Sequence, residues 1–395
     1  MISIADSFRD DLIRFLRDTI AIPSTGGKEG AVVSRIREEM EKIGYDEVWC
    51  DSLGNLFGRL GSGKRVLAID GHCDTVDVGN PDTWEVDPFG GGYRDGLIYG
   101  RGAADQKGGL ASAVYAGKIL KQTGFPPDVS LLVVASVLEE DFEGLCWRFI
   151  VEQDKIRPEA VLLTEPSNLG IRIGQRGRME MKVNMCGVSC HGSAPERGEN
   201  AIYGAARIVQ DVERLNERLA GDAILGKGSV AVTDIRSTAP SLCAVPDSAT
   251  LHLDRRLTVG DSLESAVQEI ENLPSVGKAG AKVFVPGYEV VSYTGLKIPI
   301  KAYFPMWLME EDHHLVRTAV RAYETQFEQH AHVGVWTFST NGVATKGLFD
   351  IPTIGFGPGE EKYAHTTQDQ VKAEDLVRAA AFYAAFVHEW GRDRT

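Results

Sequence analysis

Residues 66–76 read VLAIDGHCDTV, an apolar run that ends in a histidine and an aspartate. Similar apolar runs recur at 130–138 (SLLVVASVL) and 160–164 (AVLLT), and helical patterns alternate with them from near Lys107 and at 143–152. This alternation of strands and helices is typical of a sheet with mostly parallel strands. The sequence therefore predicts an α/β fold for this part of the chain.

Two amphipathic patterns precede this region, between Ser7 and about Tyr45. Proline, serine and glycine at 23–27 separate them, because these residues stop a helix. We therefore expect two helices before the first strand of the sheet.

The pattern changes after Gly177. Segments typical of strands and helices then follow one another at 179–188, 200–218, 228–236, 249–257 and 261–272. Their βαββα order is that of a βαββαβ unit before its last strand, which indicates a separate α+β module similar to a ferredoxin-like fold.

The α/β pattern returns after about Leu296, and it closes with a helix predicted at 373–391. The α+β module therefore reads as an insertion into the first domain. We place the first domain at 1–177 and 295–395, and the inserted module at 178–294. A length of 395 residues agrees with two domains, because single cores stop growing at about 250–300 residues.

The charge and composition narrow the class of partner. The formal net charge is -14, which disfavours binding to nucleic acid or to anionic lipid through long-range repulsion. The first helix carries charges at helical spacing, and no apolar run reaches membrane-spanning length. The six cysteines are dispersed without a CxxC pair, which is typical of reduced thiols. We therefore expect a cytoplasmic protein that acts on small molecules.

Five segments place acids or histidines directly after an apolar strand, where open α/β sheets bind their ligands. The residues are His72 with Asp74, Asp105, Glu139 with Glu140, Glu165 and His365. Each alone has an ordinary explanation, such as a solvated strand end or, for Asp105, a helix N-cap. Together they form a set of two histidines and several carboxylates.

Such a set suits a divalent ion such as zinc or cobalt. His72 and Asp74 lie two residues apart, so on an extended segment they share a face, and the Asp74 carboxylate can hold the imidazole. Glu139 and Glu140 face different ways, so one can bind metal while the other takes a proton from water. Two such ions can polarise a carbonyl and activate water, which predicts hydrolysis.

In this order the segments resemble those of the dinuclear metal amidohydrolases typified by acetylornithine deacetylase, succinyl-diaminopimelate desuccinylase, aminoacylase and the glutamate-releasing carboxypeptidases. The matching motifs are GHCDTV, GRGAADQKGG, LEED, TEP and AHTTQD, and the resemblance runs nearly end to end. Within this family the chain looks most similar to an uncharacterised hydrolase subgroup linked by name to selenium metabolism. The resemblance implies a zinc-peptidase-like catalytic domain with an inserted lid and dimerisation domain.

The resemblance also implies which residues bind metal. His72 and Glu165 would bind one ion. Glu140 and His365 would bind the other, and Asp105 would bridge both. The implied cofactors are two divalent ions, with zinc expected and cobalt or manganese as alternatives.

Other roles follow from the same resemblance. Glu139 would be the general base, and Asp74 would hold His72. His191, in the motif CGVSCHGSAPERGENAI, would reach across a homodimer formed by the lid domains. Arg256, in HLDRRL, would meet a substrate carboxylate, for which its forked side chain is suited.

The chain departs from the family pattern at two places near the expected substrate. Cys243 stands in CAVPD where the family often has an asparagine. The stretch FSTNGVAT at 338–345 lacks the arginine that many members have. We add Asn341 of this stretch, and Gly357 of the loop GFGPG, to the candidate substrate-binding residues.

The predicted function is hydrolysis of a linear amide bond in a small N-acyl amino acid, of the deacetylase or desuccinylase type. One alternative is a dipeptidase or aminopeptidase, which would recognise a free amino group. An alternative of another class is a metal-free binding protein that retains the fold without catalysis.

Overall fold

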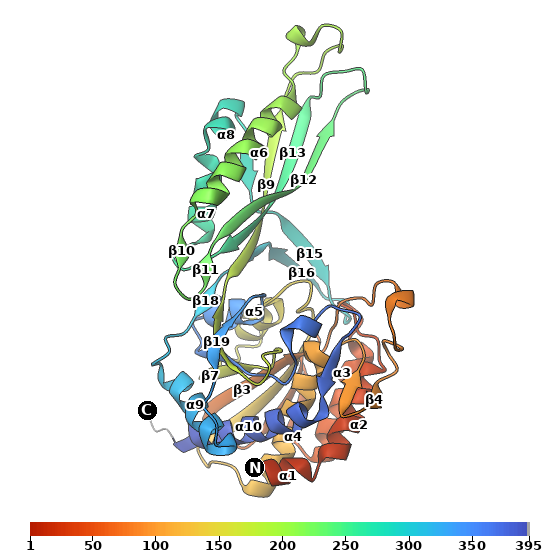
Figure 1. The fold of residues 1–395 in the computed structure, drawn as a ribbon, viewed down its shortest axis with the longest axis vertical. Helices are drawn as coiled ribbons and strands as arrows, with labels where there is room; N and C mark the ends of the chain where they lie inside the picture. Colours follow the sequence, from red (N-terminus) through yellow and green to blue (C-terminus); the bar gives the residue numbers. More distant parts are fainter. Residues whose placement is uncertain (393–395) are drawn as a thin grey trace.

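The computed structural model describes residues 1–392, which form two parts with separate hydrophobic cores. A body lies at one end of the molecule, and a module formed by the middle of the chain projects from it along the longest axis (Figure 1). The body contains the predicted α/β elements, and the module contains the predicted α+β elements.

The body is built on a sheet of nine strands among the described residues, in the order β1-β2-β6-β3-β7-β20-β8-β18, with β19 also paired to β8. Their bounds are β1 (Glu47–Cys50), β2 (Leu56–Leu60), β3 (Arg65–His72), β6 (Val129–Ser136), β7 (Ala160–Leu163), β8 (Ile171–Gln175), β18 (Trp307–Leu308), β19 (Val333–Trp336) and β20 (Thr353–Gly355). The four central strands β6, β3, β7 and β20 are mutually parallel, whereas β1, β2 and β18 are antiparallel to their neighbours. The predicted mostly parallel sheet is confirmed at its centre.

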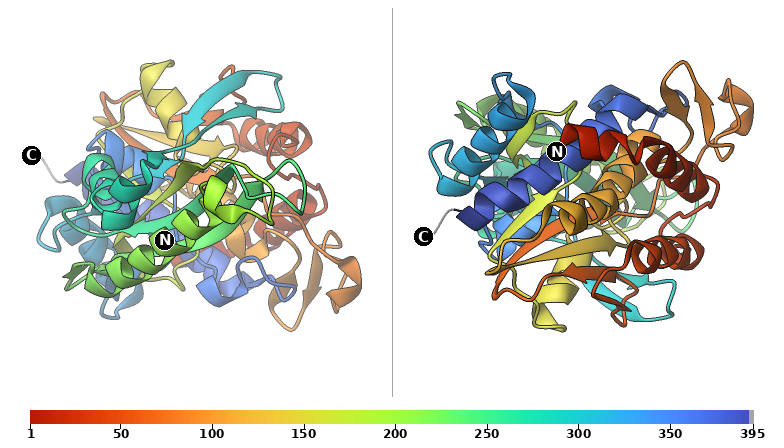
Figure 2. Two further views of the ribbon diagram at one scale, coloured as in Figure 1. Left: turned by 90° about the horizontal axis from the view of Figure 1, so that it is seen from above. Right: turned by 90° about the horizontal axis from the view of Figure 1, so that it is seen from below.

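Helices cover the central strands. The body helices are α1 (Ile2–Asp6), α2 (Arg9–Ile20), α3 (Gly30–Ile43), α4 (Gly108–Thr123), α5 (Leu145–Glu152), α9 (His314–Phe327) and α10 (Ala373–Arg392). Helices α4 and α10 lie side by side (Figure 2, right). Every residue of β6 is buried, because both faces of a parallel sheet are covered, and this explains its continuous apolar sequence.

The inserted module pairs its strands in the order β12-β13-β9-β14, and helices pack on one face of this sheet. The elements are β9 (Gly177–Cys186), α6 (Ala201–Arg218), β12 (Ser229–Thr238), β13 (Ser248–Leu257), α7 (Leu263–Glu271), α8 (Pro274–Ala279) and β14 (Lys282–Phe284). Side chains of β13 alternate between buried and half-buried, as expected for a strand with one covered face. The α+β character predicted for this segment is confirmed.

The module is joined to the body by a two-stranded ribbon. The chain leaves the body through β8 and β9, and it returns through β17 (Tyr303–Phe304) and β18. The returning chain runs antiparallel to the outgoing one, with Tyr303 opposite Met179 and Trp307 opposite Gln175. The entry and exit points of the module are therefore hydrogen-bonded neighbours.

A hairpin of β15 (Gly287–Val291) and β16 (Lys297–Lys301) spans the predicted boundary between residues 294 and 295. Its buried side chains Val290 and Ile300 belong to the core of the body. In its turn, the Tyr293 hydroxyl donates to the Gly54 carbonyl at 3.0 Å. The structure thus places this hairpin on the body rather than on the module.

Smaller elements complete the fold. A three-stranded sheet contains β4 (Gly92–Arg94), β5 (Leu97–Tyr99) and β21 (Gln370–Lys372), and the module carries a short hairpin of β10 (Gly221–Asp222) and β11 (Gly226–Lys227). Across residues 1–392, no helix combines the length and the apolar character needed to cross a membrane.

The N-terminal region differs from the prediction. The two helices predicted between Ser7 and about Tyr45 are α2 and α3, but a further short helix, α1, precedes them outside that range. Strands β1 and β2 also come before β3, although the sequence predicted none there. Both are short, and β1 lies at the edge with half-buried and exposed side chains, so it lacks a strong apolar signal.

Candidate metal centre

Four of the predicted residues lie at the carboxyl ends of neighbouring parallel strands. His72 ends β3, Glu139 and Glu140 follow β6, and Glu165 follows β7. Because β6, β3 and β7 are adjacent and parallel, their carboxyl ends meet at one edge of the sheet. The topology therefore brings together side chains that are up to 93 residues apart in sequence, from His72 to Glu165.

Asp105 lies between two histidines. Its Oδ1 is 3.1 Å from His72 Nε2, and its Oδ2 is 3.3 Å from His365 Nε2. His365 Nε2 also lies 2.8 Å from Glu140 Oε2. One oxygen of Asp105 therefore faces each histidine, which is the arrangement required of a carboxylate that bridges two ions.

The remaining acids surround the same imidazole. His72 Nε2 lies 3.8 Å from Glu139 Oε2 and 3.9 Å from Glu165 Oε1. Ligand atoms of His72, Glu139 and Glu165 fall within 4.8 Å of one another, as do those of His72, Asp105 and Glu140. All five predicted metal ligands and the predicted base thus converge in one cluster.

Asp74 contacts His72 through its main-chain oxygen and not, as predicted, through its carboxylate. His72 Nδ1 lies 2.9 Å from the main-chain oxygen of Asp74, whereas the carboxylate oxygen is 3.8 Å away. The Asp74 carboxylate instead accepts from the backbone N–H of Glu140 at 3.0 Å. A carbonyl acceptor at Nδ1 leaves Nε2 free to bind a metal ion.

The acids of the cluster repel one another. Burial, with the nearby carboxylates of Glu165 and Glu140, raises the pKa of Glu139 well above its ordinary value. Burial also raises the pKa of Glu165 and of Glu140, and in both cases Asp105 adds to the shift. Buried carboxylates at this spacing are stable as anions only when cations lie beside them.

The pKa values of the two histidines are raised as well. Hydrogen bonds with Asp105 and Glu140 raise the pKa of His365 to about 10. Burial opposes a charge on His72, but its hydrogen bond with Asp105 and the neighbouring carboxylates raise its pKa well above the ordinary value. The carboxylates around the two histidines thus favour positive charge at this place.

Divalent cations fit this cluster. The donors are imidazole nitrogens and carboxylate oxygens, which are the ligands that zinc and related ions prefer. Oε1 of Glu139 is buried and has no hydrogen-bond partner among residues 1–392, so an acceptor is available inside the centre. The residues therefore provide both the negative charge and the donor atoms of a metal site.

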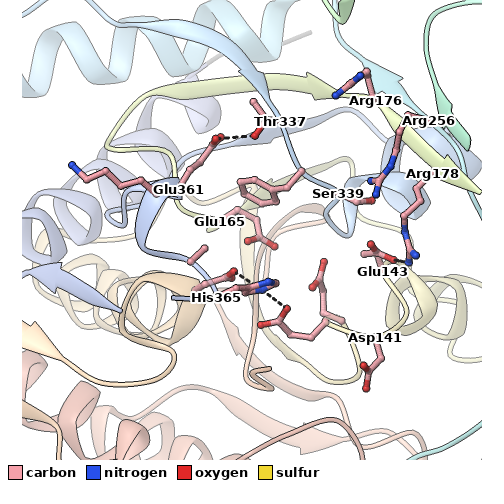
Figure 3. A pocket seen from close by; sticks show the side chains of 16 residues that line it. Asp141, Glu143, Glu165, Arg176, Arg178, Arg256, Thr337, Ser339, Glu361 and His365 are labelled. Carbon is pink, nitrogen blue, oxygen red and sulfur yellow. Dashed lines mark hydrogen bonds and ion pairs between the residues drawn. The ribbon is translucent and has the colours of Figure 1, made fainter. Parts of the chain in front are cut away.

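A cavity of about 900 Å³ opens above the cluster. Its base, which we call the carboxylate floor, consists of Asp105, Glu139, Glu140 and Glu165. Its opposite side, which we call the arginine wall, consists of Arg176, Arg178 and Arg256 (Figure 3). The wall belongs to the ribbon and to β9 and β13 of the module, so the cavity lies where the body and the module meet.

The three arginines differ in their partners. Arg178 pairs with Glu143 at 2.8 Å, and Arg256 pairs with Asp254 at 2.8 Å. Arg176 donates to the Lys227 carbonyl at 3.0 Å, and within residues 1–392 no carboxylate lies close enough to form an ion pair with it. Arg176 is therefore the wall residue with the most unbalanced charge.

Of the candidate substrate residues, the structure places only Arg256 at the cavity. Asn341 is 1% exposed and is hydrogen-bonded to Asp70, Ser136 and the Gly144 N–H, so it lies below the cavity rather than in it. Gly357 is also buried, and its N–H donates to Ser167. Neither lines the cavity.

His191 lies on an exposed loop of the module. Its ring contacts Ser193 at 2.7 Å, and it does not line the cavity of its own chain. The predicted role of His191 across a dimer stays a prediction.

Sequence reasoning missed Arg176 and Arg178. They occupy alternate positions in GQRGR, directly after the apolar β8, and alternate residues of a strand share a face. Two arginines at this spacing beside a predicted active-site edge were the available signal.

Comparisons with known proteins agree with this geometry. The sequence profile of the peptidase family M20/M25/M40 matches residues 68–389. The uncharacterised protein YgeY of Escherichia coli is 50% identical over 386 residues, which are 98% of this chain and 96% of YgeY. Succinyl-diaminopimelate desuccinylase of Rhodospirillum centenum is 26% identical over 406 residues, which cover 96% of this chain and 97% of that enzyme.

A solved structure shows the same fold. The crystal structure of aminopeptidase PepT from Bacillus cereus matches with a TM-score of 0.75 at 20% identity, over 96% of this chain and 98% of that chain. The buried cluster of metal-binding groups, the fold and the sequence match thus lead to one conclusion. The chain belongs to the peptidase family M20/M25/M40 and is a metal-dependent hydrolase that acts on carbon–nitrogen bonds.

Proposed function

We propose that this protein hydrolyses the amide bond of a small N-acyl amino acid that carries a free carboxylate, with two divalent ions of the zinc type in its centre. The supporting observation is the cavity with charges of opposite sign on its two sides. The carboxylate floor would hold cations beside the scissile bond, and the arginine wall would bind the carboxylate of the substrate.

The proposed division of the ligands between the two ions follows the family resemblance. His72 and Glu165 are proposed for one ion, and Glu140 and His365 for the other. Asp105 is proposed as the bridge, because each of its oxygens faces one histidine. Bound cations would supply Lewis acidity to the attacking water and to the substrate carbonyl.

Glu139 is the proposed general base. Its carboxylate lines the cavity, and its Oε1 makes no hydrogen bond to residues 1–392. It would accept a proton from the attacking water at this carboxylate and donate that proton to the departing amine nitrogen. Asp74 would orient two of the proposed metal ligands, because its main-chain oxygen contacts the His72 ring and its carboxylate accepts from the Glu140 N–H.

A second candidate, an aminopeptidase or dipeptidase, is favoured by a separate observation. Asp141 and Glu361 also line the cavity, and a carboxylate there would bind a free amino group. The similarity to the fold of an aminopeptidase agrees with this candidate. The two candidates differ in the charge that the substrate carries next to its scissile amide.

A substrate panel separates them. Metal-stripped enzyme would receive zinc, cobalt or manganese and be assayed with N-acetyl, N-succinyl and N-carbamoyl amino acids beside dipeptides and tripeptides. We expect turnover of acylated substrates that retain the α-carboxylate, and loss of turnover when that carboxylate is amidated. Turnover restricted to peptides with a free amino terminus would instead establish the second candidate.

We also propose that two copies associate through the module, so that His191 acts in the centre of its partner. Large apolar side chains are exposed near its loop, with Val188 54% exposed and Leu242 fully exposed. Sedimentation analysis tests the association. A monomer with full activity would exclude this role of His191.

A further inference from the structure

The loop at 137–144, between β6 and α5, carries Glu139 and Glu140 but has no regular hydrogen-bonded ladder of its own. Leu138, the residue before the pair, has a φ of 61°. A branched residue adopts this left-handed conformation only where its surroundings impose it. The direction of the Glu139 side chain therefore depends on contacts outside the loop.

Four side chains from distant parts of the chain accept hydrogen bonds from the backbone of this loop. The pairs are Asn55 Oδ1 with Val137 N–H at 3.1 Å, Glu29 Oε1 with Leu138 N–H at 3.2 Å, Asp74 Oδ2 with Glu140 N–H at 3.0 Å, and Asn341 Oδ1 with Gly144 N–H at 2.9 Å. We call these four residues the loop clamp. They hold the residues on both sides of Glu139.

Glu29 is the least expected member of the loop clamp. It is fully buried in the turn before α3, and one of its oxygens has no hydrogen-bond partner among the described residues. Burial and the nearby Asp74 carboxylate raise its pKa to about 7. A carboxyl group is costly at such a position, so a contact that only stabilises the fold does not explain it.

We propose that Glu29 is a positioning residue for the Glu139–Glu140 pair. By accepting from the Leu138 N–H, it fixes the left-handed turn that aims Glu139 into the cavity and Glu140 at His365. This inference rests on the proposed function of the two glutamates. It also explains Asn341, which holds the far end of the same loop instead of binding substrate.

The test removes the acceptor and then restores it. Glu29→Met keeps the length of the side chain but cannot accept the hydrogen bond, whereas Glu29→Gln can. We expect Glu29→Met to lower kcat and the affinity of the stripped protein for zinc about 10-fold to 100-fold. KM should stay unchanged, because Glu29 does not line the cavity. Glu29→Gln should restore both quantities.

Glu39→Met is the matched control. Glu39 is a buried carboxylate of α3, but it binds Arg35, Lys42 and the Tyr115 hydroxyl away from the centre. Its variant should melt at a lower temperature with unchanged kcat and zinc affinity. If Glu29→Met fails to fold, Glu29→Asp replaces it, because a shorter carboxylate keeps the charge and loses the reach to Leu138.

Two results would overturn the inference. One is a Glu29→Met variant with the kcat and zinc affinity of the parent protein. The other is a Glu39→Met variant that loses kcat and zinc affinity as strongly as Glu29→Met. Failure of the proposed function would be different, because the unmodified protein would then bind no zinc in the titration or cleave no amide in the panel.

Discussion

The carboxylate floor and the arginine wall face each other across one cavity, but they lie in different environments. Floor residues such as Asp105, Glu139 and Glu165 are at most 7% exposed. Glu139 and Glu165 follow strands at the centre of the sheet, and Asp105 lies in the turn just before α4. The wall residues are half-buried and lie on the ribbon and the module. The floor is thus fixed by the core of the body, whereas the wall depends on how the module stands above it.

This difference suggests that the floor serves chemistry and the wall serves substrate recognition. A buried site with several coupled acids suits chemistry, because its charges cannot be screened by water. A half-exposed wall on a separate module suits recognition, because its side chains can change without disturbing the core. Variants of the floor should therefore change kcat, and variants of the wall should change KM.

The largest expected effect comes from removing metal. Dialysis against a chelator should abolish turnover and lower the melting temperature, because ions that bind only the folded state stabilise it. Adding zinc should restore both, as followed by calorimetry and elemental analysis. Full activity of demonstrably metal-free protein would show that the floor is not a metal centre.

Glu139→Gln is expected to have the next largest effect. Loss of a general base typically lowers kcat about 10²-fold to 10⁴-fold. The metal content should stay near that of the parent protein, since Glu139 is proposed as the base and not as a ligand. Elemental analysis beside steady-state kinetics tests this, and loss of the metals would make Glu139 a ligand instead.

Arg176→Gln should have a smaller effect, and on a different quantity. A charge-assisted hydrogen bond contributes about 1.5–3 kcal/mol, so KM for a carboxylate substrate should rise about 10-fold to 150-fold with little change in kcat. Arg197→Gln, an exposed arginine of the module outside the cavity, is the matched control. Equal effects of both variants would argue for a general influence of charge and against a specific wall.

The smallest effect is expected at the surface of the module. Ile224 lies between β10 and β11 and is 48% exposed. Ile224→Ser should change the free energy of unfolding by less than about 0.5 kcal/mol and leave the kinetics unchanged. A large change in kcat would mean that the module and the floor are more tightly coupled than their contacts indicate.

The contrast between the carboxylate floor and the arginine wall also explains which parts of the site the sequence could predict. Strands β3, β6 and β7 have continuous apolar sequences that end in acids or a histidine, so both the sheet centre and the floor were predictable. In the wall, Arg256 was named through the family resemblance, but Arg176 and Arg178 were not, because half-buried arginines on alternating strands look like ordinary solvated residues. The edge strand β1 was missed because its packing is shallow.

The sequence also did not reveal how deeply the candidate residues are buried. Asn341 and Gly357 lie in glycine-containing stretches that look exposed, but the fold buries both under the cavity. Which atom of Asp74 meets His72 was likewise decided by the local path of the backbone. Such details depend on shifts of the backbone by about the length of one side chain, and residue patterns do not encode shifts of that size.

The ribbon that joins the module to the body has a consequence for protein engineering. Since Met179 and Tyr303 are paired neighbours, the chain could be cut at this level and closed by a tight turn, or joined to another α+β unit. Exchange at these two positions would replace Arg256 together with the module, whereas Arg176 and Arg178 would stay with the catalytic body. A natural family could diversify its substrates by the same exchange.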